Sequence, residues 1–266
     1  MTKKKQTMQR NNKSNTPAGA QKLLETLMLQ INQQDYAKAI DNGEKLLNYL
    51  PKTSPLRADV LSLLGDAYAF TQDYPKSYKV THELVQLRPN DPVAWYNHGL
   101  ASFFTSRMGR AVRDFERAMQ LDKTGNFKTK DIAKMPREAR KMADAALKIR
   151  GKDFTLDQLI AQEDIYQQGL AYMEEKKWQE AEDAFRKSIA IADVLPQPWA
   201  NIAGTLLMRE RYDEAEIALR HALKIDPKYQ LAKQNLKLLP ELRLHGLPEP
   251  DRMVNYDPFR GATPSF

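Results

Sequence analysis

The residue types that most often carry out chemistry are sparse in this chain, and they lack the spacing that a reaction needs. Its four histidines, His82, His98, His221 and His245, form no H-E-x-x-H motif or other metal-ligand spacing. Cysteine is absent, which excludes disulfides, thiolate catalysis and cysteine-ligated zinc. We therefore expect each histidine to be a packing or surface residue, and the sequence predicts no metal ion and no cofactor.

Motifs for phosphate binding and acyl transfer are also missing. The eleven glycines never fall in G-x-G-x-x-G or G-x-x-x-x-G-K order, and no G-x-S-x-G turn exposes a serine nucleophile. Pairs of Asp and Glu at helical spacing usually mark solvated faces. The sequence therefore predicts no catalytic residue and a protein that is not an enzyme.

A pattern of bulky and small residues organises the elements of the chain. Residues 91–123 carry Trp95, Gly99, Ala111, Phe115 and Ala118, which are 4, 12, 4 and 3 positions apart. Trp and Phe can fill the gap between two antiparallel helices, whereas the small residues let the backbones approach. The stretch is therefore predicted to form a helix pair.

In order and spacing, this pattern resembles the tetratricopeptide repeat (TPR) family. Two positions depart from it: His98 stands where the family usually has Leu, and Lys123 stands where Pro is usual. The resemblance implies an all-α TPR solenoid of about five helix pairs with a C-terminal capping helix. It also implies a scaffold or adaptor that binds other proteins.

The period of the pattern predicts the organisation of the chain. Gly65 and Gly99 are 34 residues apart, whereas Gly169 follows after 70, which is one period and 36 further residues. The predicted segments are a disordered basic tail (1–19), repeats one to three (20–53, 58–91, 92–125), a basic helical interruption (126–161), repeats four and five (162–195, 196–229), a capping helix (230–240) and a Pro-rich tail (241–266).

The interruption is predicted to contain one amphipathic helix over 137–149, with Pro136 in its first turn and Gly151 just past its end. Because the extra length is about one repeat, the segment is either an insertion or a degenerate sixth pair. Thr155 and Gln158 then form a capping box that starts a long helix.

At the C-terminus, the stretch that begins at Leu239 contains too many Pro and Gly for a helix. We expect it to be either a disordered tail or an extended segment laid back on the repeats.

The resemblance also implies a binding surface, because the first helices of TPR pairs line a concave face. Leu100 and Leu170 stand where the family usually has a polar residue, and Phe104 stands where Lys is common. We predict an apolar groove for a peptide or a partner helix. Its candidate residues are Phe70, Tyr96, Asn97, Leu100, Phe103, Phe104, Tyr166, Leu170, Met173 and Asn201. Either an external ligand or the protein's own basic helix or tail covers such a patch.

One known TPR binding mode is incomplete in this sequence. The clamp that holds acidic chaperone tails needs Lys and Asn on successive first helices, and this chain keeps only the Asn, at Asn97, Asn201 and Asn235. Asp66 is among the residues that replace the others. We do not expect chaperone-tail binding through that clamp.

The distribution of charge offers an alternative function. Residues 1–24 hold six Lys or Arg and no acid, and residues 122–152 hold ten against four, so the remainder is mildly acidic. The helix face of Arg137, Arg140, Lys141 and Lys148, with the N-terminal lysines, predicts weak contact with nucleic acid or an anionic surface. A solvated helix face is the plainer explanation. Self-association through an apolar solenoid end is a further prediction.

The hydropathy of the sequence indicates where in the cell the protein is expected. The sequence has no run of eighteen apolar residues, and its N-terminal segment lacks the apolar core of a secretory signal. We therefore expect no membrane span and a cytoplasmic location.

Overall fold

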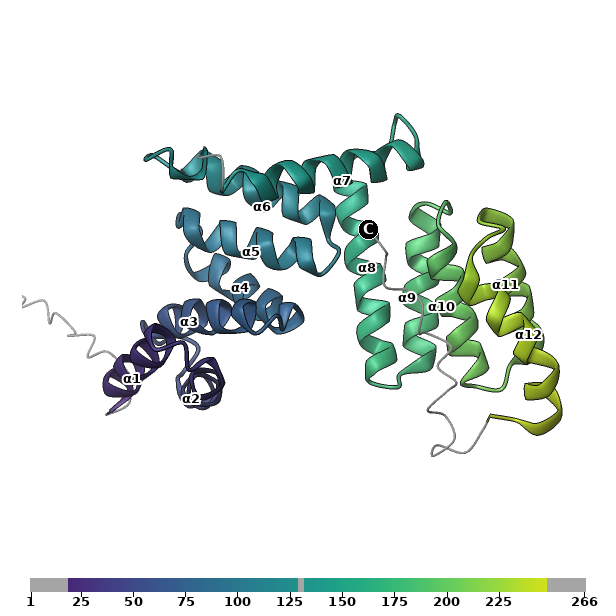
Figure 1. Cartoon of the computed structure of the whole chain (residues 1–266), viewed down its shortest axis with the longest axis horizontal. Coiled ribbons are helices and arrows are strands. Elements are labelled where there is room, and N and C mark those ends of the chain that lie inside the picture. The colour runs from purple at the N-terminus through teal and green to yellow at the C-terminus, as the bar shows by residue number, and fades with distance from the viewer. Residues whose placement is uncertain (1–18, 129–131, 248–266) are drawn as a thin grey trace, which may run out of the picture. The chain divides into compact units, whose positions relative to one another are not determined.

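The computed structural model describes residues 19–128 and 132–247 (Figure 1). These residues form twelve α-helices and one short 3-10 helix, and no strand occurs among them. The elements are α1 (Ala20–Asn32), α2 (Tyr36–Tyr49), α3 (Arg57–Phe70), α4 (Tyr74–Leu87), α5 (Pro92–Phe104), α6 (Met108–Leu121), η1 (Asn126–Lys128), α7 (Lys134–Arg150), α8 (Leu156–Glu174), α9 (Trp178–Ile191), α10 (Pro196–Leu207), α11 (Tyr212–Ile225) and α12 (Gln230–His245). The predicted all-α fold is confirmed.

The chain folds as two compact units. Among the described residues, unit 1 comprises those up to Ser106 together with those of Arg110–Glu138, and unit 2 comprises Arg107–Gly109 and those from Ala139 onward. In unit 1, α1 packs on α2 and α3 packs on α4; in unit 2, α8 packs on α9 and α10 packs on α11 (Figure 1). Successive pairs also contact each other within a unit, as α2 with α3 and α9 with α10. Each unit is therefore a stack of helix pairs.

A left-handed residue marks the turn inside each pair. These residues are Gln34, Gln72, Ser106, Lys176 and Glu210, with φ between 57° and 61°. The last four are 34, 70 and 34 positions apart, which repeats the period and the interruption seen in the glycines. After four of these turns, the next residue donates its N–H to a carbonyl five positions earlier, as Asp73 does to Tyr68. This bond satisfies a carbonyl at the end of the first helix. The described residues thus contain five helix pairs.

Close packing inside a pair depends on glycine at two equivalent positions. A Cβ atom on Gly99 would lie 2.7 Å from the Phe115 ring, and one on Gly169 would lie 2.6 Å from the Phe185 ring. Both phenylalanine side chains are fully buried. In these two pairs, the helices can therefore pack this closely only because the first helix has a glycine opposite the phenylalanine.

Helix α7 corresponds to the helix that was expected over 137–149. It begins at Lys134, so Pro136 lies in its first turn, and Gly151 follows its last residue with φ 106°, which favours glycine. The predicted capping box is also confirmed. The Thr155 hydroxyl accepts the Gln158 N–H at 3.2 Å, and Gln158 Oε1 accepts the Thr155 N–H at 2.9 Å.

The expectation that the Pro-rich stretch after the capping helix would form no helix is wrong for residues 241–245. Helix α12 continues through Pro240 to His245. A proline inside a helix removes one hydrogen bond and costs roughly 3 kcal/mol. Burial of Leu239 and Leu242 on the unit 2 core offsets that loss. The predicted tail beyond residue 247 and the N-terminal lysines lie outside the described residues.

Candidate functional site on the first helices

The candidate groove residues lie on four first helices. Phe70 is on α3, and Tyr96, Asn97, Leu100, Phe103 and Phe104 are on α5, all in unit 1. Tyr166, Leu170 and Met173 are on α8 and Asn201 is on α10, all in unit 2. The two units place their residues in different surroundings.

Unit 1 holds two exposed aromatic side chains in fixed positions. Phe70 is 65% exposed and stacks on Tyr36, with ring centroids 4.8 Å apart and planes at 11°. Phe104 is 46% exposed and stacks on Tyr74 at 4.2 Å and 15°. Phe103 meets Phe104 edge-on at 5.4 Å. Each stack joins the last residue of a first helix to the first residue of the preceding second helix, so one ring face is held while the other contacts solvent.

A carboxylate and an amide connect the same two helices. Asn97 Nδ2 on α5 donates to Asp66 Oδ1 on α3 at 3.1 Å. Phe70 lies one turn after Asp66, and Leu100 lies about one turn after Asn97, so both share the faces of this polar pair. Burial raises the pKa of the Asp66 carboxyl. We call Asp66, Phe70, Asn97, Leu100, Phe103 and Phe104 the α3–α5 strip.

Tyr96 is covered by the chain that follows α6. Its ring stacks on Phe127 of η1 at 4.9 Å and 4°, and its hydroxyl donates to the Ile132 carbonyl at 2.9 Å. Asp122 fixes this segment, because its carboxylate accepts the Thr124 and Phe127 N–H groups, both at 2.9 Å. Within unit 1, the protein itself therefore covers one of the candidate groove residues.

In unit 2, the candidate residues belong largely to the core. The Tyr166 ring lies 5.4 Å from that of Phe185, and its hydroxyl accepts from Asn201 Nδ2 at 2.9 Å. Leu170 and Met173 are half-buried against the same core. Among the described residues of α8 and α10, none is an exposed large apolar side chain. Exposed apolar candidates are therefore found only on unit 1.

Sequence reasoning missed three residues that shape the strip. Tyr36 and Tyr74 carry the aromatic stacks, and Asp66 was considered only as a residue that breaks the chaperone clamp. One signal was available for Asp66, since it precedes Phe70 by four positions and so shares its helix face. The stacking partners lie 30 or more positions away and leave no local pattern.

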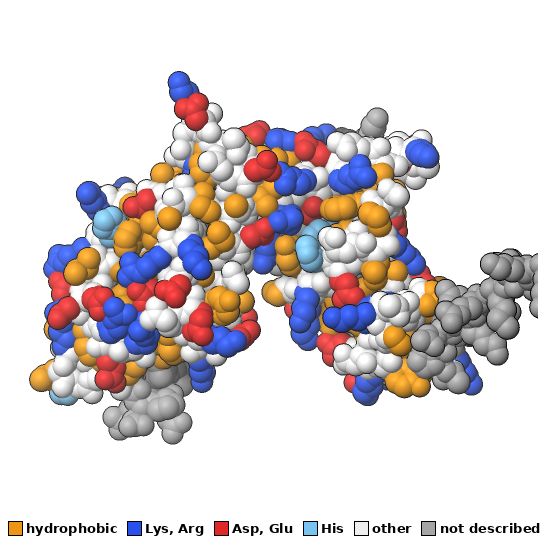
Figure 2. All heavy atoms as spheres, turned by 180° about the vertical axis from the view of Figure 1, so that it is seen from behind, with side chains coloured by type: hydrophobic (Ala, Val, Ile, Leu, Met, Phe, Trp, Pro, Cys, Tyr) orange, Lys and Arg blue, Asp and Glu red, His pale blue; other side chains and the backbone are white. Residues whose placement is uncertain are grey.

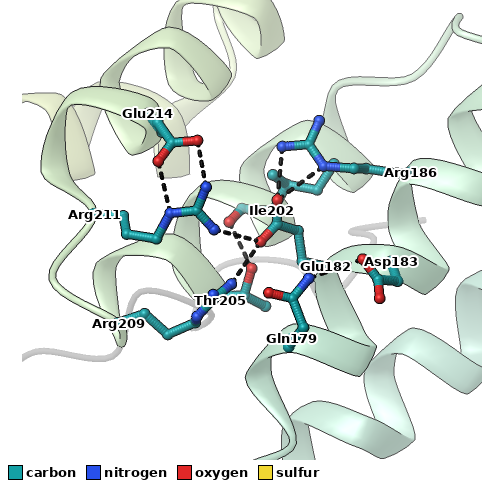
Figure 3. Close-up of polar contacts among 9 residues, drawn as sticks. All are labelled: Gln179, Glu182, Asp183, Arg186, Ile202, Thr205, Arg209, Arg211 and Glu214. Carbon is teal, nitrogen blue, oxygen red and sulfur yellow. Dashed lines mark hydrogen bonds and ion pairs between the residues drawn. The ribbon is translucent and has the colours of Figure 1, made fainter.

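A buried glutamate fixes the first pair of unit 2 to the second (Figure 3). The Glu182 side chain, on α9, is 5% exposed. Its Oε1 accepts from Arg186 at 2.7 Å, and its Oε2 accepts from Arg209 at 2.8 Å and Arg211 at 3.2 Å. Arg211 also donates to Glu214 at 2.5 Å. Since every guanidinium in this cluster already binds a carboxylate, we assign it to holding the α10–α11 turn rather than to binding a ligand.

The histidine that departs from the family pattern lies in a buried polar cluster of unit 1. His98 is 1% exposed, with its Nδ1 3.2 Å from the Thr81 hydroxyl and its Nε2 3.4 Å from His82 Nδ1. The carboxylate of Asp114 is 3.7 Å from His98 Nε2 and accepts from Ser102 at 3.0 Å. As expected from the sequence, His98 is a packing residue.

A half-buried acid, Glu163, binds the start of α6. Glu163 Oε2 accepts the Gly109 N–H at 2.9 Å, and both residues belong to unit 2. Burial raises the pKa of Glu163 to about 7, although backbone N–H donors at Gly109 and Met108 and the charge of Arg150 lower it. The carboxyl thus occupies the N-terminus of a helix, where negative charge is favoured.

The basic candidates lie along α7. Arg137, Lys141 and Lys148 are exposed, while Arg140 pairs with Asp144 at 3.9 Å. Acidic and basic side chains are interspersed on the face of the molecule drawn in Figure 2. Within the described parts of the chain, no group of three His, Asp or Glu could hold a metal ion, and no helix is long and apolar enough to cross a membrane.

Comparison with known proteins gives a family match for one repeat. Residues 196–229 match the tetratricopeptide repeat, and these are the residues of α10, α11 and their flanking turns. No curated protein matches the chain. Residues 196–229 thus match one tetratricopeptide repeat, and the described residues form five helix pairs that share a left-handed turn residue.

Several solved structures are similar at low identity. MamA is 19% identical with a TM-score of 0.35, over 79% of this chain and 93% of its own. YrrB, described as a TPR protein with an unusual peptide-binding site, is 17% identical with a TM-score of 0.37, over 85% and 94%. Pseudomonas aeruginosa pilF is 13% identical with a TM-score of 0.33, over 86% and 87%. Likeness of this degree says nothing of function.

Proposed function

We propose that this protein is a non-enzymatic adaptor that binds a peptide or a helix of a partner protein on the α3–α5 strip. The observation that carries the proposal is the pair of exposed rings, Phe70 and Phe104, each stacked on a tyrosine. A ring that is already held loses little side-chain entropy when a partner covers its free face. Exposed aromatic side chains of this kind are frequent binding anchors.

The strip supplies different kinds of contact to a partner. Leu100, Phe103 and Phe104 form an apolar surface on α5, while Asp66 and Asn97 provide polar groups beside it. A few polar groups within an apolar surface fix the orientation of what binds. Tyr96 takes no part in this proposal because Phe127 covers it.

The test compares partner capture by three forms of the full chain. Leu100→Glu with Phe104→Glu places charges on the strip and is expected to abolish capture of partners from a cell extract. Ile217→Glu with Leu244→Glu changes exposed apolar residues of unit 2, which are 64% and 77% exposed, and is the matched control. Circular dichroism checks that all forms keep their helices. Unchanged capture by the strip variant would refute the proposal.

The alternative, nucleic-acid binding through α7, is tested with the same material. Lys141→Glu with Lys148→Glu reverses two exposed charges on one helix face. The alternative predicts that the captured material is mainly nucleic acid, that salt releases it, and that only this variant fails to capture it. That result would make the basic face, and not the α3–α5 strip, the binding site.

A further inference from the structure

The acids of α3 differ in how they are neutralised. Asp59, in the first turn, pairs with Arg88. Asp66, two turns later, accepts one hydrogen bond from the neutral amide of Asn97 and joins no ion pair among the described residues. On the neighbouring α4, Glu83 pairs with Arg57. Within the part of the chain that the structure describes, Asp66 is thus a half-buried carboxylate without a cation.

The surroundings of Asp66 raise the cost of its charge. Phe70 follows on the same face of α3, and Leu100 and Phe104 follow Asn97 on α5. A negative charge among apolar side chains loses hydration, and the raised pKa of Asp66 expresses that loss. A partner that covered the strip would remove more water and increase the cost, unless it supplied a positive charge.

We infer that the partner segment bound on the α3–α5 strip carries a lysine or arginine that pairs with Asp66, between apolar side chains that cover Phe70 and Phe104. This inference rests on the proposed function. The same charge would reject acidic segments, because a second carboxylate would be brought against Asp66 without a cation between them. The partner is therefore a basic-apolar peptide segment and not an acidic tail.

The geometry also sets a spacing. Asp66 and Phe70 are four residues apart on one helix face, about 6 Å. In a helical partner, the cation is therefore expected three or four positions from the apolar side chain that covers Phe70. A hydrogen bond between the cation and Asp66 adds to an attraction that is strengthened by the apolar surroundings.

Selection from a phage-displayed library of random dodecapeptides tests the inference. The baits are the full-length wild type, Asp66→Asn, Asp66→Lys and, as a matched control, Asp41→Asn, which changes an exposed acid on α2. Asp66→Asn is expected to fold, because Asn keeps the acceptor for Asn97 and removes a charge that burial disfavours. A fifth bait, Phe70→Glu with Phe104→Glu, removes the apolar anchors.

Wild type and Asp41→Asn are expected to enrich apolar peptides with one Lys or Arg, and Asp66→Asn is expected to lose that preference. Asp66→Lys is expected to enrich Asp or Glu instead. Replacing the cation of a selected peptide by norleucine should weaken binding to wild type by about tenfold or more, with little effect on Asp66→Asn.

Two other results separate this inference from the function on which it rests. If wild type enriched apolar peptides without a basic residue, the inference about Asp66 would fall and the adaptor function would stand. If wild type enriched no peptide beyond those taken by the Phe70→Glu/Phe104→Glu bait, the adaptor function would itself be refuted.

Discussion

The third pair of unit 1 and the first pair of unit 2 have the same interior but different covers. In both, a glycine on the first helix faces a buried phenylalanine: Gly99 with Phe115, and Gly169 with Phe185. The tyrosine three positions before the glycine meets that phenylalanine at 5.2 Å and 53° in unit 1, and at 5.4 Å and 54° in unit 2. The local packing rule is therefore independent of the unit.

The outer side of each tyrosine differs between the units. Tyr166 binds Asn201, which belongs to the first helix of the next pair. Tyr96 is instead covered by Phe127 and bound to the Ile132 carbonyl, in the segment after α6. In unit 1, a short turn held by Asp122 thus contacts the outer side of the tyrosine, and in unit 2 a repeat helix does so. Where the series of repeats is interrupted, a few residues after α6 can therefore cover the α5–α6 pair in place of a further repeat.

The largest effects are expected in the shared interior. Phe115→Ala and Phe185→Ala should each destabilise their own pair by about 3–5 kcal/mol, because both leave a cavity in a fully packed site. Hydrogen exchange of peptides from α5–α6 and α8–α9 measures each pair separately. Leu244→Ala, at a side chain that is 77% exposed, should change stability by less than about 0.5 kcal/mol. A much smaller loss at one phenylalanine would break the equivalence of the two interiors.

Intermediate effects are expected at the two covers. Phe127→Ala should destabilise the α5–α6 pair by about 2–3 kcal/mol, less than a core phenylalanine because its contact is mainly with one ring. Asn201→Ala should cost about 1–3 kcal/mol in unit 2, since the hydroxyl of the half-buried Tyr166 loses its partner. Exchange protection in α5–α6 after Phe127→Ala, and in α8–α11 after Asn201→Ala, reports each change. Normal protection around Tyr96 in the Phe127 variant would show that the turn is not a cover.

The smallest effect depends on pH and is expected in unit 2. The folded-state pKa of Glu163 is raised to about 7 from an ordinary value of 4.5, so the folded chain binds this proton more tightly than the unfolded chain. The contribution of Glu163 to stability is therefore fully present below pH 4.5 and is lost as pH rises to about 7.

Glu163→Gln should remove that slope and stabilise unit 2 at pH 8 by about 1–2 kcal/mol, because the neutral amide can still accept the Gly109 N–H. Urea unfolding at pH 5 and pH 8 measures the difference. Glu180→Gln, at an exposed position on α9, is the control and should leave the slope unchanged. An unchanged slope in the Glu163 variant would contradict the assigned pKa.

Much of the fold could be predicted because its determinants are local. The 34-residue recurrence of Gly65 and Gly99 predicted successive pairs, and the capping box at Thr155 predicted the start of α8. Beyond Leu239 the local rule failed, because burial of Leu239 and Leu242 outweighed the cost of Pro240. Composition alone does not report such burial.

The candidate site was harder to predict, because exposure depends on distant parts of the chain. Leu170 and Phe104 both departed from the family pattern and were assigned to one apolar groove. In the structure, Leu170 is half-buried on the unit 2 core, whereas Phe104 remains 46% exposed. Departure from a family pattern identifies an unusual residue but does not say what lies above it.

The sequence by itself determined that this chain forms helix pairs and that Gly99 and Gly169 lie in their interiors. Helical periodicity, caps and small residues act within one pair, so the order of residues is enough to specify them. Tertiary structure alone decided that Phe127 covers Tyr96 and that Asn97 meets Asp66, across 31 residues in each case. Such contacts depend on how separate pairs stack, and no local pattern encodes which side chain remains open to a partner.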